Sequence, residues 1–148
     1  MLRPPMIRIE KPARVILGLA FLAAGVLKVV DPMAFALSIA RMQIAPKAAI
    51  GAAAIVLPWI EIVAGAALLA WPPGRSAALA IVGALLVAFS AALVIALARG
   101  TSTSCGCFGV EGGILARPGA ALARNLLLGA LAVLLATSFR RSGPASPA

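Results

Sequence analysis

The segment Ala48–Ala98 decides the fold: AAIGAAAIVLPWIEIVAGAALLA (Ala48–Ala70) is followed by WPPGR (Trp71–Arg75) and then by SAALAIVGALLVAFSAALVIALA (Ser76–Ala98). Each of the two apolar stretches has 23 residues. A helix that rises ~1.5 Å per residue needs about 20 residues to cross the hydrocarbon core of a bilayer. The short connection contains two prolines and a glycine, which favour a tight turn. The segment therefore predicts an antiparallel transmembrane hairpin.

Two further apolar stretches are expected to form transmembrane helices: Val15–Val30, which is the shorter, and Ala120–Phe139, which has 20 residues. A basic region precedes the first stretch, as in a signal peptide, but no convincing A-x-A cleavage site follows it, so we expect a retained helix. Met33–Met42 is shorter and amphipathic and predicts a helix at the membrane surface, ended by Pro46. The predicted fold class is all-α, an integral membrane four-helix bundle with four transmembrane helices plus a short interfacial helix.

The composition agrees with a chain that is surrounded by lipid. Of the 148 residues, 63% are hydrophobic and 11% are charged, and the mean hydropathy is +1.10. Soluble domains have about 45–50% apolar and about 25% charged residues. The net charge of +9 would suggest nucleic acid in a soluble protein, but most basic residues here flank apolar stretches, where they bind anionic lipid headgroups. We therefore expect the lipid bilayer, and no nucleic acid, as a partner.

The distribution of Lys and Arg predicts the orientation in the bacterial cytoplasmic (inner) membrane. With both termini in the cytoplasm, seven basic residues lie on the cytoplasmic side and four on the other side. We expect residues 1–14 to form a basic cytoplasmic N-terminus, residues 15–139 the transmembrane domain, and residues 140–148 a disordered cytoplasmic tail. This orientation places the connection after Ala98 outside the cytoplasm.

That connection contains both cysteines of the chain, Cys105 and Cys107, separated by Gly106. Because these are the two cysteines of the chain, any thiol chemistry within it must come from this pair. The chain has no histidine and no tyrosine, which removes His-ligated metals, a histidine general base and a tyrosine nucleophile. Glycine permits the sharp turn that a disulfide across one residue needs, and a strained disulfide is easily reduced. The pair is therefore a candidate redox centre. A Cu(I) site, a static disulfide and two inert thiols remain alternatives, and we expect no metal.

Polar residues within or beside the apolar stretches form a second candidate site, an intramembrane cluster of Lys28, Glu61, Arg124 and Asn125. Glu61 is the deepest, and an ionised carboxylate at that depth requires a cationic partner, for which Lys28 and Arg124 are candidates. Pro58 removes a backbone donor near Glu61, and the resulting kink would help to form a polar cavity.

Simpler interpretations of these residues remain open. Lys28 could extend to the interface and pair with Asp31, and Arg124 could cap its own helix. Trp59 could be no more than an aromatic side chain that faces lipid or the interface.

Four motifs in order resemble a known family. They are A-G-x-x-K-x-x-D-P ending at Pro32, L-P-W-x-E around Pro58 and Trp59, C-G-C-F-G from Cys105 through Phe108 to Gly109, and the R-N pair Arg124–Asn125. The pattern resembles the methylamine utilisation protein MauE family, within the wider group of DoxX-like four-helix membrane proteins, over about residues 13–139. The resemblance implies structural roles for Asp31, Pro32, Pro58, Trp59, Gly106, Phe108 and Gly109.

The resemblance also implies a function as a helper in protein maturation. The family is associated with maturation of the disulfide-rich small subunit of methylamine dehydrogenase, alongside a thioredoxin-like extracytoplasmic partner. Because this chain has one Cys pair, a relay would need the thiols of that partner. One alternative is a small-molecule or quinone-binding module in which Lys28, Glu61 and Arg124 line a cavity, and another is a scaffold without chemistry. No cofactor motif is evident, although a quinone is compatible with the predicted cavity.

Overall fold

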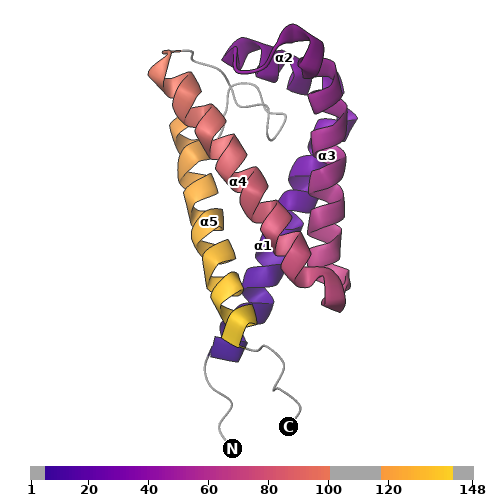
Figure 1. Cartoon of the computed structure of the whole chain (residues 1–148), viewed down its shortest axis with the longest axis vertical. Helices are drawn as coiled ribbons and strands as arrows, with labels where there is room; N and C mark the ends of the chain where they lie inside the picture. Colours follow the sequence, from indigo (N-terminus) through magenta and orange to yellow (C-terminus); the bar gives the residue numbers. More distant parts are fainter. Residues whose placement is uncertain (1–5, 101–117, 142–148) are drawn as a thin grey trace, which may run out of the picture.

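The structure, a computed structural model, describes residues 6–100 and 118–141, and these residues are almost entirely helical (Figure 1). In chain order the elements are α1 (Met6–Val30), α2 (Pro32–Met42), α3 (Lys47–Ala70), the 3-10 turn η1 (Pro72–Gly74), α4 (Arg75–Ala98) and α5 (Pro118–Arg141). The predicted all-α fold is confirmed. The described residues contain four stretches that are long and apolar enough to cross a membrane: Glu10–Val30, Lys47–Ala70, Pro72–Ala98 and Gly119–Phe139.

The first helix is longer than the apolar stretch that predicted it. It begins at Met6 and includes Glu10, Lys11 and Arg14, which precede Val15. Charged residues with long side chains are good helix formers in water, so α1 can continue beyond the bilayer. The predicted tail begins at residue 140, whereas α5 continues to Arg141.

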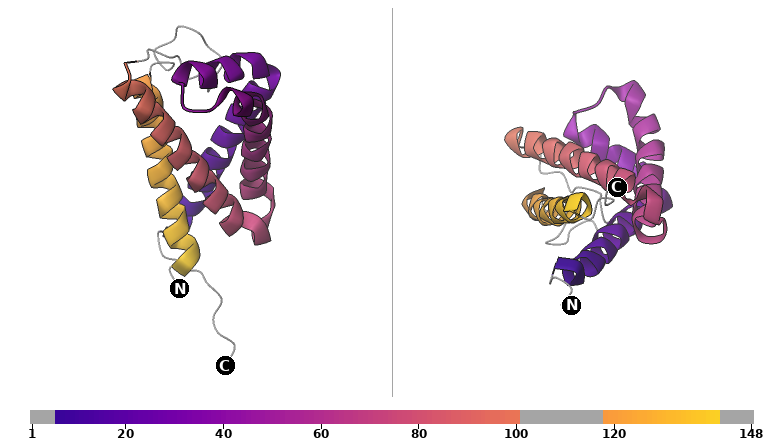
Figure 2. Two further views of the ribbon diagram at one scale, coloured as in Figure 1. Left: turned by 45° about the horizontal axis from the view of Figure 1, so that its top comes forward. Right: turned by 60° about the horizontal axis from the view of Figure 1, so that its bottom comes forward.

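The helices pack as two pairs joined by a hairpin. α1 runs along α3, α4 runs along α5, and η1 joins α3 to α4, as the prolines predicted. Contacts between α1 and α5 close the bundle. Figure 1 shows the start of α1, the end of α5 and the α3–α4 turn at one end of the molecule, and α2 across the other end; Figure 2 shows the same arrangement from two further directions.

The apolar core is divided along the bundle. A main core fills the half that contains the α3–α4 turn, and two smaller clusters lie beneath α2. The α2–α3 cluster contains Phe35, Ile39 and Ala54, and the α2–α4–α5 cluster contains Met42, Leu93, Ala96 and Ala121. The main core contains Ala13, Leu17, Phe21, Ala64, Leu68, Ala78, Leu79, Val82, Leu85, Leu86, Ala132 and Leu135.

The outward faces of the long helices are apolar. Val30, Val87 and Leu127 are among many large aliphatic side chains that are exposed on the surface. A contiguous apolar surface of this kind would be an aggregation site in water. It suits a bilayer, which the four spans require.

Candidate functional site

Three buried polar side chains lie between the main core and the two smaller clusters. Lys28 of α1, Glu61 of α3 and Asn125 of α5 are 2%, 1% and 6% exposed, respectively. On each of α3 and α5, the polar residue falls between positions that belong to different apolar clusters. We call these three residues the polar layer.

Lys28 and Glu61 form an ion pair in which Nζ donates a hydrogen bond to Oε1. The sequence predicted Lys28 as a partner of Glu61, and this prediction is confirmed. The alternative in which Lys28 pairs with Asp31 is wrong. Because both charges are removed from solvent, removing either residue alone would take a close partner from the other buried charge, and breaking a buried pair in this way typically costs about 3–5 kcal/mol.

Small residues allow α1 and α3 to approach closely enough for this pair. A Cβ atom at Gly25 would lie 2.8 Å from the carbonyl oxygen of Pro58 and 3.1 Å from the Cβ atom of Glu61. One further contact of this kind lies deeper in the bundle, where a Cβ atom at Gly65 would lie 2.8 Å from the carbonyl oxygen of Gly18. Gly18 and Gly25 are seven residues apart and therefore share one face of α1. That spacing is the sequence signal that could have identified this interface.

Two aromatic rings complete the surroundings of the Lys28 ammonium group. Nζ lies 4.9 Å from the ring centroid of Phe35 on α2 and 4.5 Å from that of Phe89 on α4. Both distances are within the range in which a cation is attracted to the face of a ring. The sequence analysis did not identify either phenylalanine, because their proximity depends on how four helices meet. Lys28 thus contacts residues of α2, α3 and α4.

The offset between α1 and α3 explains how Lys28 reaches Glu61. The sequence placed Glu61 far below the end of α1, on the assumption that α1 ends where α3 begins. In the structure, Gly25 lies level with Glu61, so Lys47 at the start of α3 extends about 13 Å beyond Val30 at the end of α1. α2 packs beside this extension of α3 through the α2–α3 cluster.

The turn between α1 and α2 is built by Asp31 and Pro32, as the resemblance implied for structural residues. The Asp31 Oδ1 atom accepts a hydrogen bond from the backbone N–H of Ala34 at 2.9 Å and so caps α2. Pro32 occupies the first helical position, where its missing N–H has no helical partner to lose. Together they direct α2 across the end of the bundle.

Pro58 and Trp59 have different surroundings although they are adjacent. Pro58 is buried within α3 and lacks the N–H that would bond the carbonyl of Ala54. Its own carbonyl faces Gly25. Trp59 is 56% exposed on the outer face of the helix, which agrees with the lipid-facing interpretation.

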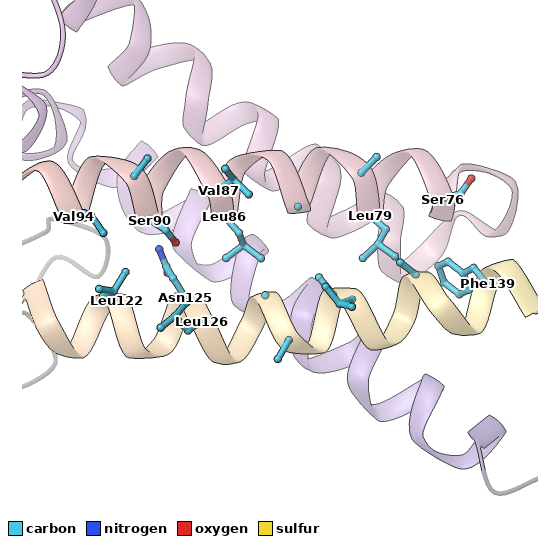
Figure 3. A pocket seen from close by; sticks show the side chains of 18 residues that line it. Ser76, Leu79, Leu86, Val87, Ser90, Val94, Leu122, Asn125, Leu126 and Phe139 are labelled. Atoms are coloured by element: carbon cyan, nitrogen blue, oxygen red, sulfur yellow. The ribbon is translucent and has the colours of Figure 1, made fainter.

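Arg124 and Asn125 lie on α5. The Nη2 atom of Arg124 donates to the Oδ1 atom of Asn125 at 3.5 Å, the outer limit for a hydrogen bond. The predicted contact between Arg124 and Glu61 stays a prediction. Asn125 also lines a groove between α4 and α5 (Figure 3).

This groove is apolar and long, with a volume of about 1160 Å³. Lys28, Glu61 and Arg124, which were expected to line a cavity, are not part of its described wall, whereas Asn125 is. The neighbouring polar side chain is Ser90 of α4, which Figure 3 shows opposite Asn125. The remaining walls are mostly aliphatic or small.

The predicted redox centre, with Cys105, Gly106, Cys107, Phe108 and Gly109, lies outside the described residues. Among the described residues, no group of three or more His, Cys, Asp or Glu side chains could hold a metal ion.

Four membrane-spanning helices with a buried charge pair define a small multi-pass membrane protein. The family model described as "Methylamine utilisation protein MauE" matches residues 6–138. The chain is also 38% identical over 136 residues to the methylamine utilization protein MauE of Paracoccus denitrificans, an alignment that covers 90% of this chain and 71% of that protein. The chain therefore belongs to the MauE family. No solved structure matches it.

Proposed function

We propose that this protein is a membrane-embedded thiol–disulfide factor that assists disulfide formation or maturation of an exported protein. Membership of the MauE family supports this proposal, together with the Cys105–Cys107 pair. The name of the Paracoccus relative further supports a role in methylamine utilisation. The family resemblance suggests the small subunit of methylamine dehydrogenase as the client.

The observation that carries the proposal is the arrangement of the two helices that precede and follow the cysteines in the sequence. The end of α4 and the start of α5 lie at the end of the bundle that α2 crosses (Figure 1). This arrangement supports a location of the pair near one membrane surface. The excess of Lys and Arg at the opposite end supports a cytoplasmic location for both termini and an extracytoplasmic location for the cysteines. Disulfides form and persist in that compartment.

The proposed chemistry is a pair of disulfide exchanges. A client thiolate attacks the Cys105–Cys107 disulfide and forms a mixed disulfide, which releases one cysteine as a thiolate. A second client thiolate then resolves the mixed disulfide, so that the client gains a disulfide and the pair becomes a dithiol. The disulfide of a thioredoxin-like partner reoxidises the pair by the same two exchanges and is itself reduced.

The bundle supplies a fixed platform for this exchange. Lys28 binds Glu61 and also contacts rings from α2 and α4, so it ties the end that carries the cysteines to the polar layer. Packing of α2 against α3, α4 and α5 supports the same end. We assign these groups a positioning role, without contact with the exchanging sulfur atoms.

Trapping of mixed disulfides tests the proposal. The variants Cys105→Ser and Cys107→Ser are expressed separately in cells that contain the client, and adducts are separated by non-reducing electrophoresis. We expect at least one single variant to accumulate a reducible adduct, because its remaining thiol cannot be released by the missing neighbour. The double variant is the matched control and should trap nothing. Normal client disulfides in both single variants, with no adduct, would contradict the proposal.

Labelling with a membrane-impermeant maleimide tests the orientation. After reduction, wild-type protein in intact spheroplasts should be labelled, whereas the double serine variant should not. Labelling that requires prior disruption of the membrane would place the cysteines in the cytoplasm.

A further inference from the structure

The groove between α4 and α5 has the dimensions of a ligand site. Its volume of about 1160 Å³ slightly exceeds the range for small-molecule sites, about 300–1,000 Å³. Its lining extends along α4 from Ser76 to Val94, or about 27 Å of helix. Gly83 and Gly129 form part of the wall, and a Cβ atom at either position would meet no atom within 4 Å. The space beside these glycines is therefore open.

One buried polar side chain is directed into this apolar space. Asn125 is 94% buried, and its Oδ1 atom faces Arg124, a residue that can only donate. The amide nitrogen consequently lies on the groove side, where Figure 3 shows it directed toward α4 near Ser90. Among the described residues, the hydrogen bond of the Asn125 side chain is the one that Oδ1 accepts from Arg124, and Nδ2 lies beside the groove. At membrane depth an unsatisfied amide donor is costly, so an occupant that offers an acceptor would be stabilised.

The depth of Asn125 limits the kind of molecule that can offer this acceptor. Asn125 follows the start of α5 by seven residues, or about 10 Å of helix. The ester carbonyls of a phospholipid lie near its charged headgroup at the interface, which opposes their descent to this level. A transmembrane helix uses its backbone carbonyls in its own hydrogen bonds. An uncharged, lipid-soluble molecule with a carbonyl group has neither restriction.

We propose that the α4–α5 groove binds an elongated, uncharged quinone, with a ring carbonyl that accepts a hydrogen bond from Asn125 Nδ2 and an isoprenoid tail along the apolar wall. The Ser90 hydroxyl is placed to contribute a second donor on the opposite wall. The tail would extend past Gly83 and Gly129 toward Phe139. This binding site lies in the membrane-spanning part of the α4–α5 pair, and it does not depend on the function proposed for the cysteines.

Equilibrium binding of tritiated ubiquinone-2 tests the proposal. The full chain is placed in nanodiscs of diether phosphatidylcholine, a lipid without ester carbonyls, and retention of the label is measured relative to protein-free nanodiscs. We expect saturable binding of about one molecule per chain. Asn125→Leu should weaken binding about tenfold, in line with the loss of one hydrogen bond of about 1.4 kcal/mol.

A variant that fills the groove provides an independent test of quinone binding. Gly83→Leu should abolish saturable binding, because its side chain would occupy the open space beside α4. Gly51→Leu is the matched control: a Cβ atom at exposed Gly51 also meets nothing within 4 Å, but the residue lies on α3, away from the groove. It should bind ubiquinone-2 like the wild type. Size-exclusion profiles identify variants that do not fold.

Several results would overturn the proposal. These are absence of saturable binding to the wild type, equal binding to Gly83→Leu and Gly51→Leu, and equal competition by squalene, an isoprenoid without a carbonyl. Unchanged affinity of a folded Asn125→Leu protein would remove Asn125 as the donor. If the wild type forms dimers and Gly83→Leu disrupts them, the groove would instead bind a second copy of the chain. If Asn125→Leu does not fold, Gly83→Leu and squalene still decide the outcome.

Discussion

The α1–α3 and α4–α5 interfaces both contain glycines and buried polar side chains, but they are packed in opposite ways. Backbone of the neighbouring helix lies against Gly25 and Gly65 in the first interface. Open space lies beside Gly83 and Gly129 in the second. The buried charge of Glu61 meets Lys28 of the adjacent helix, whereas the Asn125 amide nitrogen faces a groove. Glycine content therefore does not reveal which helix pair is closed; the opposing surface decides it.

This difference in packing suits the α1–α3 interface to a rigid role and the α4–α5 groove to ligand binding. A buried ion pair requires fixed distances, because loss of contact leaves two costly charges in hydrocarbon. A neutral amide beside an open groove tolerates exchange of its partner at a smaller cost. We therefore expect substitutions in the α1–α3 interface to affect folding, and substitutions in the α4–α5 groove to affect binding.

Removing one charge of the ion pair should produce the largest loss of stability. Lys28→Met leaves Glu61 buried without its lysine partner and removes two ring contacts, so we expect a loss of about 3–5 kcal/mol. Thermal unfolding of the detergent-extracted protein and its folded yield measure this loss. The double variant Lys28→Met with Glu61→Gln should recover part of it.

The double-mutant cycle also provides the control. Additive losses for Lys28→Met and Glu61→Gln would mean that the pair does not stabilise the protein. A parallel cycle of Glu61→Gln with Arg124→Gln tests the predicted contact between those residues. Its coupling energy should be smaller than that of the direct Lys28–Glu61 pair.

A glycine-to-alanine substitution, which adds one methyl group, should lower stability in the α1–α3 interface and raise it in the α4–α5 interface. Gly65→Ala places a Cβ atom 2.8 Å from the carbonyl oxygen of Gly18 and 2.9 Å from the nitrogen of Leu22, so backbone must move. We expect a loss of about 1–3 kcal/mol. Gly83→Ala is the matched control, with no atom near its new methyl group, and alanine favours the helix by about 1 kcal/mol. Equal effects in thermal unfolding would remove the distinction between a closed and an open interface.

Substitution of Arg99, which forms a surface contact between the end of α4 and the end of α2, should have the smallest effect on stability. Arg99 at the end of α4 donates through Nη1 to the carbonyl oxygen of Gln43, which follows α2, at 2.8 Å. Because this bond is exposed, Arg99→Gln should cost at most about 1 kcal/mol. Arg99→Lys, which keeps the charge but shortens the reach, serves as the comparison. A loss as large as that of Lys28→Met would show that α2 is held mainly by this contact and not by its apolar clusters.

Much of the fold could be predicted from the sequence because the bilayer imposes a length on apolar helices. The four spans, the tight turn between α3 and α4 and the helix that begins after Asp31 all follow from local patterns. The pairing of Lys28 with Glu61 followed from the cost of an isolated charge in hydrocarbon. The family resemblance, carried by four short motifs, is also confirmed.

The relative positions of the helices could not be predicted in the same way. Register depends on which small residues face each other, and the sequence does not show that Gly25 lies level with Glu61. For the same reason, Phe35 and Phe89 were missed, although each is visible as an aromatic residue among aliphatic ones. The α4–α5 groove is an outcome of packing on both helices, so Asn125 was recognised as polar but not as part of its wall.

The sequence separation of Lys28 and Glu61 has a consequence for biosynthesis. The two residues are 33 positions apart, so at about 5–20 residues per second the lysine is made about 2–7 seconds before its partner. During that interval α1 carries a lone ammonium group, but this group has a long stem and lies two residues from the helix end, where it can extend to the interface. Glu61 lies in mid-helix on a shorter stem. The order of the helices thus exposes the more tolerable charge first, and insertion of α3 draws Lys28 to its final depth.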